Sequence, residues 1–528
     1  MKFIFIFLFV SSFYQLKAQT PQIDWWYDIH DESFGISAMA DLDFDGYPEV
    51  VFSAYRNDSC LYVLNADDGS LLWKVNTGGC NDVAPLIYDV DHDDTLDIVL
   101  ASSCVPKTFC FNGMTGKEKW QCNTRGSDSP PTIADIDDDG VDEVLHGEFM
   151  GYVICINAVT GVEEWEMDVD GGNSWVQTAP TILDLNGDQY LDFVVATWGF
   201  GDTSFIRAYR GPDQHVLWTS YLPQDVMYHG AAYADIDKDG MPELSIGSYD
   251  GTLYVLNGEN GSLKWQYTFP GSTYIGAPTS IADLNNDDSL EIIAFAGYQV
   301  ACFSPSGIKL WDKNVPAYAS SFRGAAIADV NEDDTLDIVF GASDGVVYAW
   351  SGASGANIWE VDLRAHHDSS DFEIDHAPVI GDFDNDNNLD VFIVGGKTYY
   401  PDIEYDYGRA YVIDLGMGLS ADWPMFRHDV YRSACLCENS FAGIENADAV
   451  EFSVFPNPVS EYLFISNPDK VMINSVEIYN LNGTLVYYSD IRSLNDNRRI
   501  TVSDLANGVY FIRINTEKGL FGQKFLVL

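Results

Sequence analysis

The chain has 528 residues, too many for one small domain, and 46% of them are hydrophobic, which suffices for a large core. It carries 81 acidic residues against 27 basic ones, so its formal net charge at pH 7 is −54. This excess of negative charge argues against nucleic acid or an anionic membrane surface as a partner.

Residues 1–18 have the pattern of a signal peptide. Lys2 precedes an apolar run, and Ala18 lies just before Gln19. The run is too short to span a membrane stably, and no later segment has the length of a transmembrane helix. We therefore expect an exported mature chain without a membrane-spanning segment.

Nine cysteines fit an oxidising compartment. Cys80 precedes the first strand of a predicted sheet and Cys104 ends the second, so both fall at one end of an antiparallel pair. A disulfide is expected there. For the remaining cysteines, including Cys435 and Cys437, buried thiols and bridges both stay open.

The dominant feature is a repeated unit, seen most clearly at Asp235–Trp265. It opens with a tight loop that has oxygen-bearing side chains at positions 1, 3, 5 and 9. In this copy they are Asp235, Asp237, Asp239 and Glu243. Calcium prefers six to eight oxygen ligands in such loops, and the segments that follow read as β-strands, so an EF-hand is excluded.

Eight such acidic loops begin about 49 residues apart, the spacing of propeller blades. Position 3 is Asn in three loops, and position 6 is least typical at Gln189. Eight acidic turns without metal are the alternative, but charge repulsion disfavours them. The expected ligands of up to eight structural calcium ions are Asp41, Asp43, Asp45, Glu49, Asp89, Asp91, Asp93, Asp97, Asp135, Asp137, Asp139, Glu143, Asp184, Asn186, Asp188, Asp192, Asp235, Asp237, Asp239, Glu243, Asp283, Asn285, Asp287, Glu291, Asp329, Asn331, Asp333, Asp337, Asp382, Asp384, Asp386 and Asp390.

A tryptophan recurs in phase with the loops, four residues after a glycine. The tryptophans with this spacing are Trp73, Trp120, Trp165, Trp265, Trp311 and Trp359, whereas Trp218 follows Gln214. A glycine turn and a large aromatic side chain suit packing between blades, so we interpret these residues as core. Either Trp25 or Trp26 would supply an eighth such strand.

These patterns predict an all-β chain with an eight-bladed β-propeller. The segment after the last acidic loop is too short to supply a fourth strand for the last blade. We therefore expect residues 23–29 to complete this blade by pairing near residues 410–414. Such closure hides the sheet edges of the ring.

The acidic loops resemble the FG-GAP/VCBS repeats of integrin-type calcium propellers. The glycine-tryptophan strands and the segment Trp423–Asp429 resemble PQQ-like propeller repeats, and together these resemblances cover residues 23 to about 434. Quinoprotein dehydrogenases typically carry a disulfide between adjacent cysteines. This chain has no adjacent cysteines, so PQQ is not expected.

The composition changes after the propeller, which we place at residues 19–434. Residues 435–450 read as a linker, and residues 451–528 as short strands with Asn-Gly turns that form a small β-sandwich. Their motifs resemble a type A C-terminal sorting domain of the type IX secretion system. That resemblance implies the type IX machinery as partner, export across the outer membrane and loss of the tail. A carbohydrate-binding sandwich is the alternative.

The blade plan also predicts where a ligand binds. The acidic loops should lie on one face of the propeller. Residues six or seven positions before each acidic loop should then surround the opening of the central channel on the other face, and the long loop at residues 397–408 adds tyrosines there. The candidate ligand-binding residues are Asp82, Asp128, Trp175, His229, Arg323, Asp375, His376, Tyr399 and Tyr405. An ordinary polar rim without a ligand is the alternative.

Three functions fit the sequence. The first is a secreted or surface-attached, calcium-stabilised propeller, not an enzyme, that binds glycan or protein and serves adhesion. The second is a polysaccharide lyase in which His229 or His376 acts as base and Arg323 or calcium neutralises the uronate. The third is a purely structural scaffold.

Overall fold

The computed structural model describes residues 20–418 except 200–203, 223–224, 226 and 272–273. It also describes 421–425, 427–428 and, beyond residue 452, mainly strands. Two compact units make up the chain, Met1–Cys437 and Glu438–Leu528. The expected signal peptide (1–18) and linker (435–450) lie outside the described residues.

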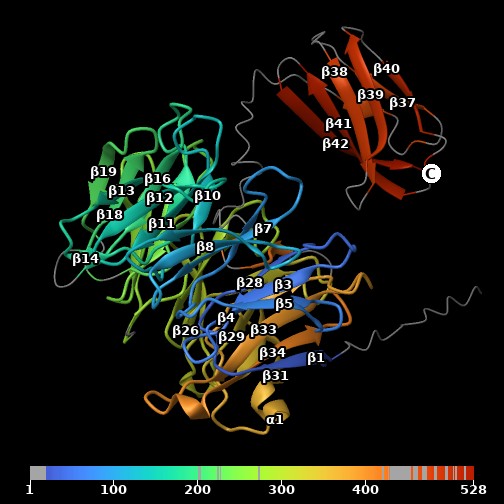
Figure 1. The fold of residues 1–528 in the computed structure, drawn as a ribbon. Helices are drawn as coiled ribbons and strands as arrows, with labels where there is room; N and C mark the ends of the chain where they lie inside the picture. Colours follow the sequence, from blue (N-terminus) through green and yellow to red (C-terminus); the bar gives the residue numbers. More distant parts are fainter. Residues whose placement is uncertain are drawn as a thin grey trace, which may run out of the picture. The chain divides into compact units, whose positions relative to one another are not determined.

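The first unit is an eight-bladed β-propeller, as the sequence predicts (Figure 1). Each blade is an antiparallel sheet of four strands. In blades 1 to 4 these are β2 (Ala38–Ala40), β3 (Glu49–Ser53), β4 (Cys60–Asn65), β5 (Leu71–Asn76); β6 (Leu86–Tyr88), β7 (Asp97–Ser102), β8 (Lys107–Asn112), β9 (Glu118–Asn123); β10 (Thr132–Ala134), β11 (Glu143–Glu148), β12 (Tyr152–Asn157), β13 (Glu163–Asp168); and β15 (Thr181–Leu183), β16 (Asp192–Ala196), β18 (Ile206–Arg210), β19 (Val216–Ser220).

Blades 5 to 8 repeat the plan. Their strands are β20 (Ala232–Ala234), β21 (Glu243–Gly247), β22 (Thr252–Asn257), β23 (Leu263–Thr268); β24 (Ser280–Ala282), β25 (Glu291–Ala296), β26 (Gln299–Phe303), β27 (Lys309–Asn314); β28 (Ala326–Ala328), β29 (Asp337–Gly341), β30 (Val346–Ser351), β31 (Asn357–Asp362); and β32 (Val379–Gly381), β33 (Asp390–Lys397), β34 (Tyr407–Asp414), β1 (Gln22–Ile29).

The first strand of each blade faces the axis of the ring, because the first strands of neighbouring blades contact each other, as β2 does β6 and β28 does β32. Second and third strands are almost wholly buried between blades, whereas fourth strands such as β5 alternate in exposure. Short elements lie in the connections. β14 (Ser174–Trp175), η1 (Pro316–Tyr318) and α1 (Leu363–His367) lie between blades, whereas β17 (Trp198–Gly199) and η2 (Ile403–Tyr405) lie between the second and third strands of blades 4 and 8.

The N-terminal strand closes the ring, which confirms the prediction. Strand β1 pairs antiparallel with β34, with Ile23 opposite Ile413 and Tyr27 opposite Ala410 (Figure 1). Trp25 is the tryptophan of this blade, since it is buried whereas Trp26 is about half exposed.

The tryptophans join each blade to the next, as the sequence indicates. In six blades the indole Nε1 donates to a backbone carbonyl of the following blade. These bonds run from Trp25 to Ala66, Trp73 to Gly113, Trp120 to Ala158, Trp218 to Gly258, Trp265 to Pro305 and Trp311 to Gly352. The paired glycine needs its small size, because a Cβ on Gly116 (φ +66°) would lie 2.6 Å from the Trp73 ring.

Blade 4 departs from this pattern at Gln214, which keeps a left-handed backbone (φ +54°) without being glycine. Its side-chain amide donates to the carbonyl of Gly211 at 2.7 Å, the position that corresponds to Gly113 in blade 2. Trp165 Nε1 is buried and has no hydrogen-bond partner among the described residues. Gln214 thus occupies the acceptor that the tryptophan would use.

A segment that the sequence analysis assigned to a propeller repeat lies instead in the centre of the ring. Strand β35 (Ala421–Trp423) pairs with β28, the first strand of blade 7, and the Ile380 amide of blade 8 donates to the Pro424 carbonyl. We call residues 421–428 the channel segment. It adds a fifth strand to blade 7 beside the axis.

Arg427 fixes the far end of the channel segment. Its side chain is 2% exposed, and it donates to the carbonyls of His229 (3.2 Å) and Ala231 (3.1 Å) and to Thr181 Oγ1 (3.1 Å). A Cβ on Gly230 would lie 2.5 Å from the Arg427 Nη1. Because these groups belong to blades 4 and 5, the segment crosses the channel from blades 7 and 8.

The C-terminal unit is a two-sheet β structure around its own core. One sheet has three strands and the other four, which agrees with the predicted sandwich. The strands are β36 (Ser453–Phe455), β37 (Tyr462–Ser466), β38 (Ile473–Asn480), β39 (Leu485–Ser493), β40 (Arg498–Thr501), β41 (Gly508–Thr516) and β42 (Gly519–Val527). Within the described residues, no helix has the length and apolarity needed to cross a membrane.

Candidate functional site

All eight acidic loops connect the first strand of a blade to its second. In blade 3 the position-1 carboxylate of Asp135 accepts the amides of Asp139 (3.1 Å) and Gly140 (2.9 Å). The position-9 carboxyl of Glu143 accepts the amide of Ile136 at 3.0 Å. The other loops repeat these bonds, so the sequence folds each loop around its own carboxylates.

The position-9 carboxyl groups are buried at the base of the loops. One oxygen binds the backbone, and the second has no hydrogen-bond partner in Glu49, Asp97, Glu143, Asp192 and Asp337. Buried polar atoms are normally paired, so each of these oxygens has acceptor capacity left for a ligand. Several loops also bring three carboxylates within 4.8 Å of one another, as Asp135, Asp137 and Glu143 do.

Burial also raises the pKa of every position-9 carboxyl. The pKa reaches about 6 in Asp97, about 7 in Glu49, Asp192, Glu291 and Asp390, and about 8 in Glu143 and Asp337; that of Glu243 is raised as well. Neighbouring loop carboxylates add to the effect in most blades. A bound cation would offset the cost of ionising these buried, neighbouring carboxyl groups, so the donor set fits calcium.

The opposite face carries a group of polar side chains from six different blades. We call it the mouth cluster. Its members are Asp82, Asp128, Gln177, His229, Arg323, Asp375 and His376. The blade plan thus brings together seven residues that lie up to 294 positions apart in the sequence.

Arg323 interacts with several other members of the mouth cluster. Its Nη1 lies 3.0 Å from His229 Nε2, and its charge acts on Asp82 and Asp375. Its Nε is buried without a partner in the described structure, and the side chain is 5% exposed. The guanidinium therefore has donor capacity left for a ligand.

Two carboxyl groups lie side by side next to this arginine. Burial, and then the charge of Asp128, raise the pKa of Asp82 well above its ordinary value. Gln177 donates to Asp128 at 2.8 Å. Asp82 Oδ1, Asp128 Oδ1 and Gln177 Oε1 are buried without partners among the described residues, so acceptors face the mouth as well.

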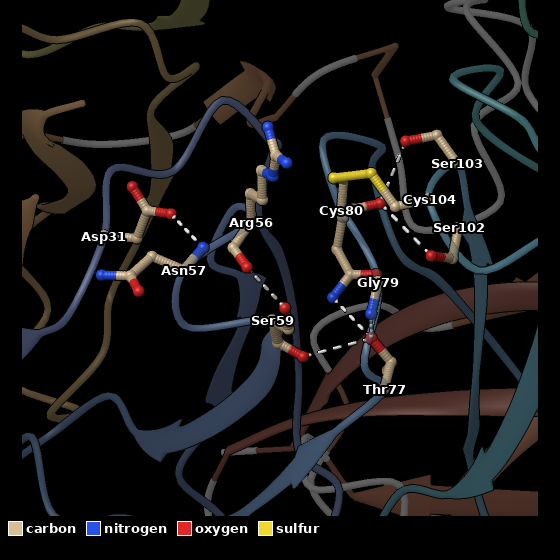
Figure 2. The surroundings of a disulfide bond; sticks show 11 residues. Asp31, Arg56, Asn57, Ser59, Thr77, Gly79, Cys80, Ser102, Ser103 and Cys104 are labelled. Carbon is tan, nitrogen blue, oxygen red and sulfur yellow. Dashed lines mark hydrogen bonds between the residues drawn. A yellow bond between two sulfur atoms is a disulfide. The ribbon is translucent and has the colours of Figure 1, made fainter. Parts of the chain in front are cut away.

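A disulfide precedes the mouth residue Asp82 in the chain. Cys80 and Cys104 are joined as predicted, and the hydroxyls of Ser102 and Ser103 donate to the Cys80 carbonyl at 3.3 Å (Figure 2). The segment before β6 is thereby tied to the loop between β7 and β8. Asp82 lies two residues after the bridge.

Both candidate histidines are buried and neutral. Burial, followed by the charge of Arg323, lowers the pKa of His229 well below its usual range and that of His376 to about 3. His376 Nε2 lies 3.1 Å from Ser37 Oγ, and His229 Nε2 faces Arg323. Such histidines are weak bases, which counts against their role in the lyase hypothesis.

A row of aromatic rings borders the mouth cluster. Ring centroids lie 5.0 Å apart for Trp198 and Tyr249, 5.0 Å for Tyr249 and Tyr274, 5.7 Å for Tyr274 and Phe322, and 5.8 Å for Phe322 and Tyr228. Trp175 pairs with Trp198 across β14 and β17 and packs on Phe149. The rings meet edge-on or tilted, and all of the row except Tyr228 is partly exposed, so the row lines the mouth with aromatic surface.

Sequence reasoning missed part of this row and one carboxylate. Tyr249 lies in the turn between the second and third strands of blade 5. Phe322 fits because Gly276 leaves space, since a Cβ there would lie 2.1 Å from its ring. Glu32 is 1% exposed, and its nearest carboxylates are Asp375 and Glu373.

Tyr399 and Tyr405 lie between β33 and β34, and their part in the ligand site stays a prediction. The base of their loop contacts the mouth, since Lys397 pairs with Glu373. The Tyr399 hydroxyl donates to Asp371, and Tyr405 is 66% exposed. In the described part of the chain, no contact joins either tyrosine to the seven cluster residues.

Comparison with known proteins bears on both units. The family described as "Secretion system C-terminal sorting domain" matches residues 453–528. The protein is a β-propeller with a sorting domain for export by the type IX secretion system. The sorting domain directs it to the cell surface or the extracellular space. The family described as "Outer membrane protein assembly factor BamB", a PQQ-like propeller family, matches residues 204–406.

Solved structures show the same fold at low sequence identity. The Vibrio cholerae biofilm matrix protein Bap1 is 14% identical with a TM-score of 0.60, over 77% of this chain and 93% of that one. Saccharomyces cerevisiae Sqt1 is 13% identical with a TM-score of 0.53, over 75% and 99%. The quinohemoprotein alcohol dehydrogenase ADHIIG of Pseudomonas putida HK5 is 14% identical with a TM-score of 0.52, over 75% and 76%. No curated protein matches the sequence.

Proposed function

We propose that this exported propeller is a non-enzymatic adhesion module that binds an extracellular glycan at its mouth, with calcium in the acidic loops as a structural support. The observation that carries the proposal is the aromatic row beside the mouth cluster. Aromatic faces stack on sugar rings, and carboxylates, amides and guanidinium groups pair with hydroxyls.

The chemistry of the mouth favours a polar ligand. Arg323 offers a donor, while Asp82, Asp128 and Gln177 offer acceptors that lack partners among the described residues. A flat protein surface would leave these recessed atoms unpaired, whereas a sugar chain that enters the mouth supplies both donors and acceptors. The glycan alternative is therefore favoured over a protein ligand.

Calcium supports this site indirectly. The acidic loops connect the first two strands of every blade, so they fix the first strands that surround the channel and carry the mouth residues at their other ends. The similarity of the fold to a biofilm matrix protein agrees with an adhesive role outside the cell.

The test is binding of the full chain, in calcium, to a panel of neutral and uronate-containing polysaccharides, measured by calorimetry. We expect at least one polysaccharide to bind, and Tyr249→Ala and Arg323→Met to weaken it by about tenfold or more. Tyr47→Ala serves as the matched control, because Tyr47 lies in an acidic loop on the opposite face.

Two outcomes would contradict the proposal. If no polysaccharide binds, the mouth is an ordinary polar rim and the protein a scaffold. If ultraviolet absorbance shows unsaturated product during incubation, the protein is a lyase.

A further inference from the structure

The eight acidic loops are not equivalent, because two of them contain a lysine ammonium. In blade 2, Lys119 Nζ lies 2.7 Å from Asp91 Oδ1, 2.8 Å from Asp97 Oδ2 and 3.5 Å from Asp93 Oδ2. These carboxylates stand at positions 3, 9 and 5 of the loop. The ammonium thus contacts three of the four side chains expected to bind calcium.

Blade 5 has the same arrangement. Lys264 Nζ lies 2.7 Å from Glu243 Oε1, at position 9, and also pairs with Asp237, at position 3. Both lysine side chains are only 19% exposed, and each ammonium pairs with at least two loop carboxylates. The lysines are therefore held in the loops.

The position of these lysines in the blade is specific. Each directly precedes the blade's tryptophan on the fourth strand, so its side chain reaches the loop of its own blade. The other blades have a different residue there: Leu72, Glu164, Leu217, Leu310, Ile358 and Asp24 in blades 1, 3, 4, 6, 7 and 8. In blade 3 the charge of Glu164 acts on Asp137 and Glu143, which shows that this position faces the loop.

We propose that Lys119 and Lys264 replace calcium in blades 2 and 5, so that the chain binds calcium tightly in the six remaining loops. This inference rests on the proposed calcium sites. Calcium binds oxygen ligands at about 2.3–2.6 Å, so an ion would compete for the same oxygens as the ammonium. To enter, it must break two or three partly buried ion pairs and repel the displaced charge.

Four of the loops without lysine keep an acceptor for the ion at position 9. In blades 1, 3, 4 and 7 the second oxygen of the position-9 carboxyl is buried and lacks a partner in the described structure. In blade 5 the corresponding oxygen of Glu243 binds Lys264 instead. In blade 2 the Asp97 Oδ1 also lacks a partner among the described residues, so there the ammonium competes through Asp97 Oδ2, Asp91 and Asp93.

Blade 4 has a nearby cation, but among the loop carboxylates Arg210 pairs only with Asp188, at 3.6 Å. Its other partner is Asp213, outside the loop, and Asp192 Oδ1 has no partner in the described structure.

Tightly bound calcium per chain tests the proposal, measured by equilibrium dialysis of the full chain and metal analysis. About six ions are expected. Lys264→Met should add one, and Lys264→Gln is the second variant if the first does not fold. Lys309→Met is the matched control, because Lys309 lies on a fourth strand but contacts Tyr267 and Asp312 rather than a loop. It should leave the count unchanged.

The converse change makes the test stricter. Leu310 occupies in blade 6 the place of Lys264 in blade 5 and is 47% exposed, so Leu310→Lys should remove one ion. Eight ions in the wild type, with no gain in Lys264→Met, would overturn the lysine proposal and leave calcium support intact. Absence of bound calcium in all variants would instead refute calcium support, and the lysine proposal with it.

Discussion

The guanidinium Nη1 of Arg427 lies 3.1 Å from the carbonyl oxygen of Ala231, so the end of the channel segment is bound to the entrance of blade 5. Arg427→Met would leave buried carbonyls without donors. We expect it to destabilise the propeller by about 2–4 kcal/mol, measured by urea unfolding.

Arg364 provides the control for that change. It pairs with Asp362 beside α1 and is about one-third exposed, so Arg364→Met should cost less than about 1 kcal/mol. Equal effects of the two substitutions would show that the channel segment does not support the ring.

Blade 4 offers a substitution that should stabilise the protein. Gln214→Gly removes a side chain from a left-handed backbone and frees the Gly211 carbonyl for Trp165 Nε1. We expect a gain of about 1 kcal/mol in unfolding free energy. Gly116→Ala is the opposing case, because its Cβ would meet the Trp73 ring, and it should lower stability by at least that amount. A loss in Gln214→Gly would contradict this description of the blade contact.

The disulfide should contribute both to the stability of the propeller and to polysaccharide affinity at the mouth. Cys80→Ser removes a bridge that closes a short loop, which should cost about 3 kcal/mol. Because Asp82 lies two residues away, polysaccharide affinity should fall as well. Cys302→Ser, at a buried free thiol, is the control. Unchanged affinity in Cys80→Ser would exclude a positioning role for the bridge.

Stability without calcium should depend on pH in a defined direction. Burial raises the pKa of the position-9 carboxyls to about 6–8 in the folded chain, as in Glu49 and Glu143, so the unfolded chain loses these protons first as pH rises. After treatment with EDTA, the melting temperature should be at least about 5 °C higher at pH 5.5 than at pH 8. Calcium should reduce the difference, because it stabilises the ionised form. A calcium-free protein that gains stability up to pH 8 would contradict this.

The blades were predictable because each repeats its own signals. Acidic side chains at fixed spacing and a tryptophan in phase mark every blade, and Trp25 marks the strand that closes the ring. The mouth cluster followed from the same periodicity, since its members occupy equivalent places before the first strands.

The channel segment was not predictable in this way. Ala421–Trp423 pairs with a strand more than 90 residues earlier, and such a three-residue strand has no local pattern that names its partner. The contacts of Lys119 and Lys264 with the acidic loops were not predictable either, because they depend on which side of the fourth strand faces the loop. Tyr399 and Tyr405 stay a prediction, because they were assigned to the mouth from loop length, which does not fix the direction of a side chain.

The claim that calcium in the acidic loops supports the ring is tested most directly by the melting temperature of the full chain in calcium and after EDTA. A site filled at 100 times its Kd contributes about 2.7 kcal/mol, so several sites together should give a fall of more than about 10 °C that added calcium reverses. An identical melting temperature in calcium and in EDTA would contradict the claim.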